Sequence, residues 1–456
     1  MQKLKRLLLR RRPQPGHESP ASTSAPTPAP KSPSIPASTP AISAEISCLS
    51  KLEKLPFEIR NEILLAVDTI EDLCALVHAS PTFHQQYRLD RIFWLWHCLQ
   101  AEMGHCVFDA YIASQCNTPE FRLKRTREKS LEFIEEYKLQ RSKFTGTPPE
   151  QLYEDDIISM ATFHSSIVCT LAHEYIAWTR TNLEGLSVPD QTSRIEQKRI
   201  IRGMYRFQIF CNLFGAVRDA KYERRAETLE LQERLELFLS EYEPWEIEEI
   251  LCINAFSEAQ YDKVFEEVQW DLHPNNPAWY AERTDPFTPP NAYCLLDDNS
   301  YRDGMVSLGL PVLSATFKTQ DHSKLVKLIS SEVVSLWDGW LLETTEQYHQ
   351  ERRRDNLYSD RDKAQDSREK MGFNGDKDDS PSLTWVTMWK ETYSNLYGDM
   401  IPAPLRKWGY IMWDRNRVVN SGALAIIDEE WKSYYWRVND DGEREDPRND
   451  MLTRSL

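Results

Sequence analysis

Residues 55–64 read LPFEIRNEIL, and residues 72–83 read DLCALVHASPTF. In the first run, Pro56 suits the opening turn of a helix, where a missing backbone N–H costs nothing, and Glu58 suits the positive end of the helix dipole. The apolar positions of this segment recur at steps of three and four: Ile59, Ile63, Leu64 and Val67. The first run therefore predicts an amphipathic helix.

The second run predicts two further short helices. Glu71 and Asp72 supply acids to the first turn of one helix. Its apolar positions repeat the helical spacing: Ile70, Leu73, Leu76 and Val77. Ser80 and Pro81 then suit the N-cap and first turn of the next helix. One side of that helix carries large apolar residues: Phe83, Tyr87, Ile92, Phe93, Trp96 and Leu99. Three short helices bury little surface by themselves, so we expect them to pack against a partner or the rest of the chain.

Together the two runs resemble an F-box. The first part of the family's pattern is a Leu-Pro start, a Glu-aliphatic step and an Ile-Leu pair, matched by Leu55, Pro56, Glu58, Ile59, Ile63 and Leu64. The second part is an acid-leucine step that leads to a small-polar turn and an aromatic residue, matched by Asp72, Leu73, Leu76, Ala79, Ser80 and Phe83. Trp94 or Trp96 stands where the family often ends with a tryptophan. Pro81 departs from the family's basic residue and is similar to a variant in F-box-like proteins of filamentous fungi.

The resemblance implies a non-catalytic adaptor that docks on Skp1 and thereby joins a cullin–RING ubiquitin ligase. The residues that it implies for Skp1 binding are Leu55, Pro56, Ile59, Ile63, Leu64, Leu73, Leu76 and Phe83. The expected function is the substrate receptor of an SCF-type ligase in the ubiquitin conjugation pathway, with an unknown protein target. The alternative is a lineage-specific interaction or scaffold protein whose F-box-like corner is only structural.

The expected fold is mainly α, with the three-helix F-box followed by a large helical domain. Residues 1–48 should form a disordered tail, basic at first and then rich in Pro, Ser and Thr. Residues 49–104 would form the F-box, and residues 105–456 a helical substrate-recognition domain. Charge dominates residues 350–382, which suggests a mobile surface loop with some helix at its start. The basic residues 1–12 fit a nuclear-localisation patch, an organelle presequence or an inert tail.

Apolar periodicity predicts several helices in the larger domain. They are expected at residues 122–143, 152–181, 193–214, 216–241, 246–269 and about 323–348. Further on, aromatic residues recur at steps of four: Trp385, Trp389, Tyr393 and Tyr397. This spacing predicts one face of a helix that packs into the core. An alternative is that some of these tryptophans line a groove for the target protein, since Trp, Tyr and Arg often anchor interfaces.

Composition limits the classes of partner. The formal net charge of −16 and the pI of about 5.2 argue against a nucleic-acid-binding surface, which needs clustered Lys and Arg. We find no run of apolar residues long enough for a membrane span. The nine cysteines are scattered without a C-x-x-C pair, which suggests reduced thiols in a cytoplasmic or nuclear protein, or one found in both places.

Signatures of common enzymes are missing from the sequence. We find no G-x-x-x-x-G-K-[ST], no G-x-G-x-x-G and no G-x-S-x-G. The nearest metalloprotease pattern, HEYIA at residues 173–177, lacks the second His ligand because Ala177 takes its place. The pairs His97-Cys98 and His105-Cys106 are weak candidates for metal ligands. We therefore expect no catalytic residue, cofactor or metal, and an enzyme with an unrecognised helical site is the third class considered.

Overall fold

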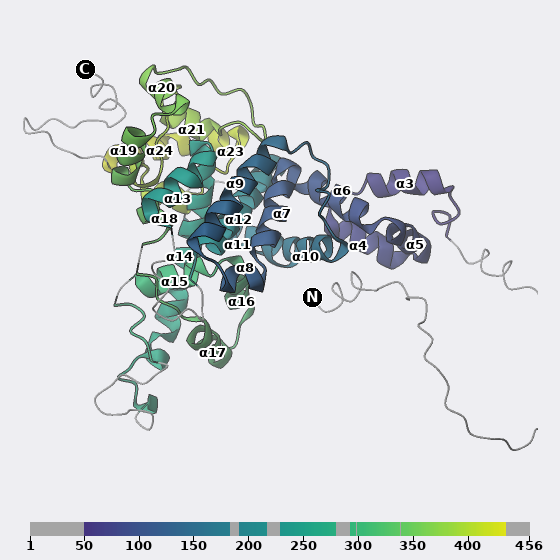
Figure 1. The fold of residues 1–456 in the computed structure, drawn as a ribbon, viewed down its shortest axis with the longest axis horizontal. Coiled ribbons are helices and arrows are strands. Elements are labelled where there is room, and N and C mark those ends of the chain that lie inside the picture. The colour runs from purple at the N-terminus through teal and green to yellow at the C-terminus, as the bar shows by residue number, and fades with distance from the viewer. Residues whose placement is uncertain are drawn as a thin grey trace, which may run out of the picture. The chain divides into compact units, whose positions relative to one another are not determined.

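The protein is described by a computed structural model (Figure 1), which covers residues 50–182, 191–216, 229–279, 292–297, 299–337 and 339–434. Over these residues the regular structure is helical, apart from an isolated antiparallel bridge between Lys370 and Thr392. The mainly α expectation is therefore confirmed for the described part of the chain. Within that part, the helices are too short or too polar to cross a membrane. The tail at residues 1–48 lies outside the described residues, so its expected disorder and targeting stay predictions.

The chain divides into two compact units. Unit 1 comprises residues 1–101 and 150–162, and unit 2 comprises residues 102–149 and 163–456. The helices of unit 1 are α3 (Phe57–Leu65), α4 (Ile70–Ala79), α5 (Pro81–Leu89), most of α6 (Arg91–Met103) and most of α10 (Glu154–Phe163). Unit 1 therefore contains the predicted F-box segment up to residue 101, together with one helix from later in the chain.

Ser80 and Pro81 begin a helix of unit 1 as the sequence predicts, whereas Pro56 is the N-cap residue of α3 and does not lie in its first turn. The Thr69 hydroxyl accepts a hydrogen bond from the Asp72 N–H at the start of α4. The Ser80 hydroxyl caps α5 by accepting from the Phe83 N–H, and Pro81 is the first residue of that helix. These side chains satisfy backbone donors that would otherwise have no partner in the first turn.

The prediction of a single third helix is wrong. The residues form two helices, α5 (Pro81–Leu89) and α6 (Arg91–Met103). The chain leaves helical geometry at Asp90, whose side chain accepts from the Phe93 N–H and so starts α6. Phe93 is 43% exposed, whereas Trp96 and Leu99 are buried. Periodicity alone did not show that a cap interrupts the pattern.

Two long helices form the centre of unit 2: α12 (Arg194–Phe214) and α14 (Pro244–Leu272). Ser193 and Glu196 form a capping box that begins α12, and Pro244 occupies the first turn of α14. Almost all of α12 is buried, including charged residues: Glu196, Arg199, Arg202 and Arg206. A buried charge must be paired, so these residues determine where oppositely charged partners lie, such as Arg417 for Glu196.

Shorter helices surround this pair. Those before α14 are α7 (Val107–Cys116), α8 (Pro119–Leu123), α9 (Arg127–Lys143), the π-helical turn η3 (His164–Val168), α11 (Cys169–Thr181) and α13 (Leu231–Leu237). Those after it are α15 (Ser300–Ser307), α16 (Leu310–Lys318), α17 (His322–Glu332), α18 (Leu341–Thr344), α19 (Gln347–Asn356), α20 (Asp360–Asp366), α21 (Leu383–Met388), α22 (Ala403–Trp408), α23 (Arg415–Asn420) and α24 (Ala423–Tyr434).

Each of the six predicted helical segments contains helix, but several boundaries differ, and the helices α7, α15, α16, α22, α23 and α24 were not predicted. The segments 122–143, 152–181, 193–214 and 246–269 are mainly helical, as predicted. Of the segment 216–241, residues 217–228 lie outside the described part, and α13 forms within the remainder. The single helix predicted for 323–348 is wrong: α17 ends at Glu332, and α18 and α19 follow as separate helices.

The charged segment 350–382 also differs from the expected loop. It contains most of α19 and all of α20. Arg353 on α19 donates from Nη2 to the Asp362 Oδ1 of α20 at 2.9 Å, and both side chains are buried. Neighbouring charges in this segment therefore neutralise each other inside the fold, which a composition argument does not show.

The prediction for the aromatic residues after this segment is partly wrong. Since α21 ends at Met388, the four aromatic residues do not form one helical face. Trp385, Trp389 and Tyr397 are nevertheless buried, so the expected packing into the core is confirmed for them. Trp389 also lies edge-on to Trp431 of α24, with ring centroids 5.4 Å apart. The tryptophans thus hold the last helices together.

Candidate functional site

The residues predicted to bind Skp1 fall into two sets. Leu64, Leu73 and Phe83 are at most 1% exposed and belong to the core of unit 1. The others are half-buried or exposed: Leu55, Pro56, Ile59, Ile63 and Leu76. The structure therefore brings the buried set together as packing residues and leaves the second set accessible.

The accessible set centres on α3. Ile59 and Ile63 share one side of this helix because they are four residues apart, and Pro56 is the N-cap residue just before the helix. Pro56 is exposed, Ile59 is 46% exposed, and Ile63 is half-buried. Phe57, which sequence reasoning did not select, is also 46% exposed. We call Pro56, Ile59 and Ile63 the α3 face.

Polar contacts hold α3 on another side. The Arg60 guanidinium donates from Nε to the Gln86 Oε1 at 2.9 Å and from Nη1 to the carbonyl of Leu55 at 2.7 Å. Gln86 in turn donates to the Phe57 carbonyl at 3.2 Å. These bonds position α3 against α5. Ile59 is therefore exposed on a helix that its neighbours hold in place.

A second candidate is a charged cavity of about 260 Å³ in unit 2. Its lining combines cations, acids and aromatic rings from several helices: Met103, His105, Cys106, Phe108, Asp109, Arg141, Phe144, Lys198, Arg202, Arg206, Glu246, Asp378 and Asp379. His105 and Cys106, considered from the sequence as a metal pair, therefore lie beside this cavity.

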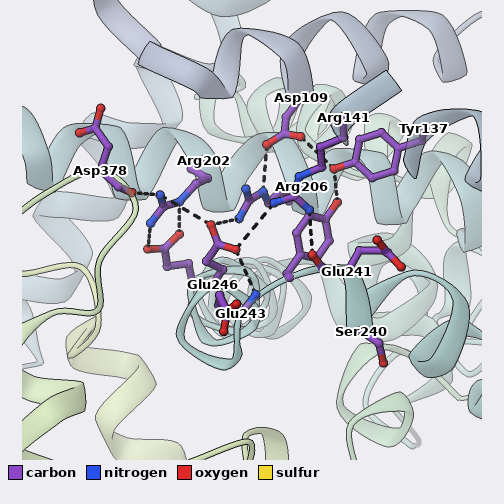
Figure 2. A network of polar contacts seen from close by, with 12 residues as sticks. Asp109, Tyr137, Arg141, Arg202, Arg206, Ser240, Glu241, Glu243, Glu246 and Asp378 are labelled. Carbon is purple, nitrogen blue, oxygen red and sulfur yellow. Dashed lines mark hydrogen bonds and ion pairs between the residues drawn. The ribbon is translucent and has the colours of Figure 1, made fainter. Parts of the chain in front are cut away.

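One wall of the cavity is a buried polar network (Figure 2). The Asp109 carboxylate accepts from the Tyr137 hydroxyl and from the Arg206 Nε, both at 2.9 Å. The Tyr137 hydroxyl also lies 2.8 Å from that of Tyr242. Arg206 pairs with Glu246 through Nη1 and Oε1 at 2.8 Å. The network joins α7, α9, α12 and α14.

Arg202 extends the network to Glu249 and to the backbone of Asp378. Its Nε and Nη2 donate to the two oxygens of Glu249 at 2.7 and 2.5 Å, and its Nη1 donates to the carbonyl of Asp378. The Asp378 carboxylate accepts from the Lys198 Nζ at 2.6 Å. Glu249 and Asp378 are thus held by the cations Arg202 and Lys198 of α12.

The pKa values of Glu246 and Tyr137 in this network lie far from neutral pH. Burial alone would raise the pKa of Glu246, but the guanidiniums of Arg206, Arg202 and Arg141 outweigh it and lower the pKa to about 2. Burial, reinforced by the Asp109 charge, raises the pKa of Tyr137 well above its ordinary value. Glu246 therefore stays ionised and Tyr137 stays protonated near pH 7. Such groups hold helices together rather than exchange protons.

A third group could hold a metal ion: Glu102, His164 and Cys169. The His164 Nε2 lies 3.2 Å from the Glu102 Oε1 and 3.4 Å from the Cys169 Sγ. The Cys169 Sγ lies 3.7 Å from the same Glu102 oxygen. Sequence reasoning missed this group because Glu102 is far away in the chain and the other two residues are five positions apart. On an α-helix that spacing turns side chains about 140° from each other.

Comparisons with known proteins were negative: the family models, the curated proteins and the solved structures give no match to this chain. The residues and contacts described above therefore carry the functional argument.

Proposed function

We propose that the chain is the substrate receptor of an SCF-type ubiquitin ligase. It docks on a Skp1-like protein through residues 49–104 and holds an unidentified target protein with the helical region that follows. The observation that supports this most is the exposed α3 face, because Pro56, Ile59 and Ile63 are among the positions that resemble the F-box pattern. Transfer chemistry would belong to other subunits of the ligase, and this chain would supply proximity.

Exposure of the α3 face has an energetic consequence. Covering an aliphatic side chain that was exposed stabilises a complex by about 1.5–3 kcal/mol when burial is complete. Ile59 is nearly half exposed and lies on a helix that Arg60 and Gln86 already fix. Docking therefore needs little reordering of the chain, which keeps the entropic cost of binding low.

Burial narrows the set of docking residues. Leu64, Leu73 and Phe83 contribute by holding the helices of unit 1 together, since they are fully covered in the chain itself. Direct contact with a Skp1-like partner falls to Leu55, Pro56, Ile59, Ile63 and Leu76 in this proposal. Substitutions in the two sets should therefore have different effects on stability and on capture.

The test is capture of purified Skp1 by the full chain and by surface variants. Ile59→Asp and Pro56→Asp place a carboxylate in the proposed contact and should abolish capture, because a buried unpaired charge is costly. Leu89→Asp is the matched control: Leu89 is 63% exposed at the end of α5 in the same unit, outside the proposed contact. This variant should capture Skp1 like the wild type.

The outcome separates this proposal from the scaffold alternative. Failure of the wild-type chain to capture Skp1 would contradict the proposal. If Ile59→Asp unfolds the whole protein in a circular dichroism melt while Leu89→Asp does not, the α3 face belongs to an internal core. The F-box-like corner would then be structural, as in the scaffold alternative.

A further inference from the structure

We infer that Glu102, His164 and Cys169 of unit 2 form a binding site for a divalent metal ion of the zinc class. The three ligand atoms are already spaced as such an ion requires. Zinc at ordinary bond lengths in a tetrahedron separates the N and O ligands by about 3.3 Å and either from the S ligand by about 3.5 Å. The corresponding distances are 3.2 Å for N to O, 3.4 Å for N to S and 3.7 Å for O to S.

The ligand types suit the same ion. Thiolate, imidazole and carboxylate are the three side-chain groups that bind zinc in proteins. A Cys169 thiolate and a Glu102 carboxylate would together balance the two positive charges of the ion, while His164 binds as a neutral ring. The complex is then neutral overall, which suits a position where His164 is 0% exposed.

The backbone is shaped to bring two of the ligands together. Residues 164–168 form a π-helical turn, and the Cys169 N–H donates to the His164 carbonyl five residues earlier. The wider turn moves Cys169 toward the side of the helix that carries His164. Single π turns inside α-helices occur frequently at functional sites, and this turn is an observation independent of the ligand distances.

The orientation of the His164 ring distinguishes a metal site from a catalytic relay. In a Cys–His–carboxylate relay, the thiol and the carboxylate contact different ring nitrogens. Here both Cys169 and Glu102 approach Nε2. Convergence of three ligand atoms on one point, with one ring nitrogen shared, is the geometry that a metal ion requires.

The other ring nitrogen has a fixed partner. The His164 Nδ1 lies 3.1 Å from the Tyr205 hydroxyl, and the two rings are stacked with centroids 6.0 Å apart. When Nδ1–H donates to this oxygen, the Nε2 lone pair faces Glu102 and Cys169. Such outer partners orient the histidine ligands of metal sites.

The site has a route for the ion. The Glu102 side chain is 21% exposed and Cys169 is half-buried, so one side of the group reaches solvent. Three protein ligands leave one tetrahedral position for water or for a group of another molecule. Zinc sites that exchange ligands have this composition, whereas structural sites have four protein ligands.

The experiment uses the full-length chain after its metal is removed with a chelator. Zinc is titrated in competition with a chromophoric chelator, and cobalt is added separately as a spectroscopic probe. We expect one ion per chain and an absorption band of thiolate-to-cobalt charge transfer. Cys169→Ser should abolish the band, and Glu102→Gln should weaken zinc binding at least tenfold. Tyr205→Phe keeps the stacked ring and should weaken it 10- to 100-fold.

Two matched controls locate the ion. Cys294→Ser removes another half-buried cysteine of unit 2, and His173→Asn removes an exposed histidine of α11. Both variants should bind like the wild type. A wild-type chain without the cobalt band would overturn the inference, as would a band that survives in Cys169→Ser. Circular dichroism confirms that each variant is folded, and Skp1 capture plays no part, so the result is independent of the proposed docking.

Discussion

Arg406 and Glu248 form a two-pronged ion pair inside unit 2. The Arg406 Nε donates to the Glu248 Oε2, and its Nη2 donates to Oε1, each at 2.9 Å. The two side chains are 4% and 0% exposed. Burial alone would lower the pKa of Arg406, but the Glu248 charge outweighs it and raises the pKa above its ordinary value. Both groups are therefore ionised, and the pair holds α22 against the central helix α14.

Arg406→Met should destabilise the protein by about 3–5 kcal/mol, because it leaves the Glu248 carboxylate buried and unpaired. The double variant Arg406→Met with Glu248→Met should recover much of this loss, since it removes both charges and keeps apolar volume. Urea unfolding followed by circular dichroism measures each difference. The control is Arg352→Ala on the exposed side of α19, which should change stability by less than about 0.5 kcal/mol. An equally small effect of Arg406→Met would contradict the prediction.

Tyr137 (Figure 2) and its partner Tyr242 should differ in their contribution to stability. Tyr137→Phe removes a donor from the buried Asp109 and leaves the Tyr242 hydroxyl without its contact, so we expect a loss of about 1–3 kcal/mol. Tyr242→Phe keeps the bond from Tyr137 to Asp109 and should cost less. Tyr153→Phe, at a residue 72% exposed, is the control for hydroxyl removal. The order of the unfolding midpoints in urea checks the prediction, and equal losses for all three variants would refute it.

Burial, with added repulsion from Asp303 and Asp262, raises the pKa of Glu258 on α14 from 4.5 to about 7. The unfolded chain releases this proton near pH 4.5, whereas the folded chain keeps it until about pH 7. Folding is therefore favoured by this group below pH 4.5, and the contribution is lost as the pH rises through 7. The loss amounts to at most about 3.5 kcal/mol, since one unit of pKa corresponds to about 1.4 kcal/mol.

Glu258→Gln should remove this part of the pH dependence. The amide still accepts the hydrogen bond that the Asn254 side chain donates at 2.9 Å, but it carries no charge at any pH. We expect the variant to gain stability relative to the wild type at pH 8 and to differ little at pH 4.5. The exposed Glu132→Gln on α9 should leave the pH profile unchanged. Thermal melts across this range give the comparison, and parallel profiles for Glu258→Gln and wild type would exclude the proposed cause.

The parts of the fold that the sequence predicted are those with local causes. Ser80 and Pro81 begin α5 because the cap and the fixed proline dihedral act within one helical turn. The long helices α12 and α14 were predicted because apolar periodicity persists over many residues. The docking residues came from a resemblance, which did not separate buried Leu64 from exposed Ile59.

The parts that the sequence did not predict depend on contacts between distant segments. The pairing of Arg353 with Asp362 buries charge in a segment whose composition suggested a loop. The metal ligands were hidden because a π turn changes the angular position of Cys169 relative to His164, and because Glu102 belongs to another helix. Periodicity and composition describe each segment by itself, so neither gives these partners.

Two glycines provide a matched test of packing at the helix ends. Gly409 after α22 and Gly422 after α23 have φ values of +70° and +73°, a conformation in which an L side chain costs about 1–2 kcal/mol. A Cβ at Gly422 would meet nothing within 4 Å, whereas a Cβ at Gly409 would collide with the Tyr175 hydroxyl and lie 3.2 Å from the Thr179 Cγ2.

Gly409→Ala should therefore destabilise the protein more than Gly422→Ala, by roughly a further 1–3 kcal/mol from overpacking. Tyr175→Phe removes the colliding oxygen and should offset part of that excess when it is combined with Gly409→Ala. A double-mutant cycle in urea measures this coupling, because residues in direct contact deviate from additivity. Equal losses for the two alanine variants would show that backbone strain alone determines both costs and that α22 can shift away from α11 to accept the methyl group.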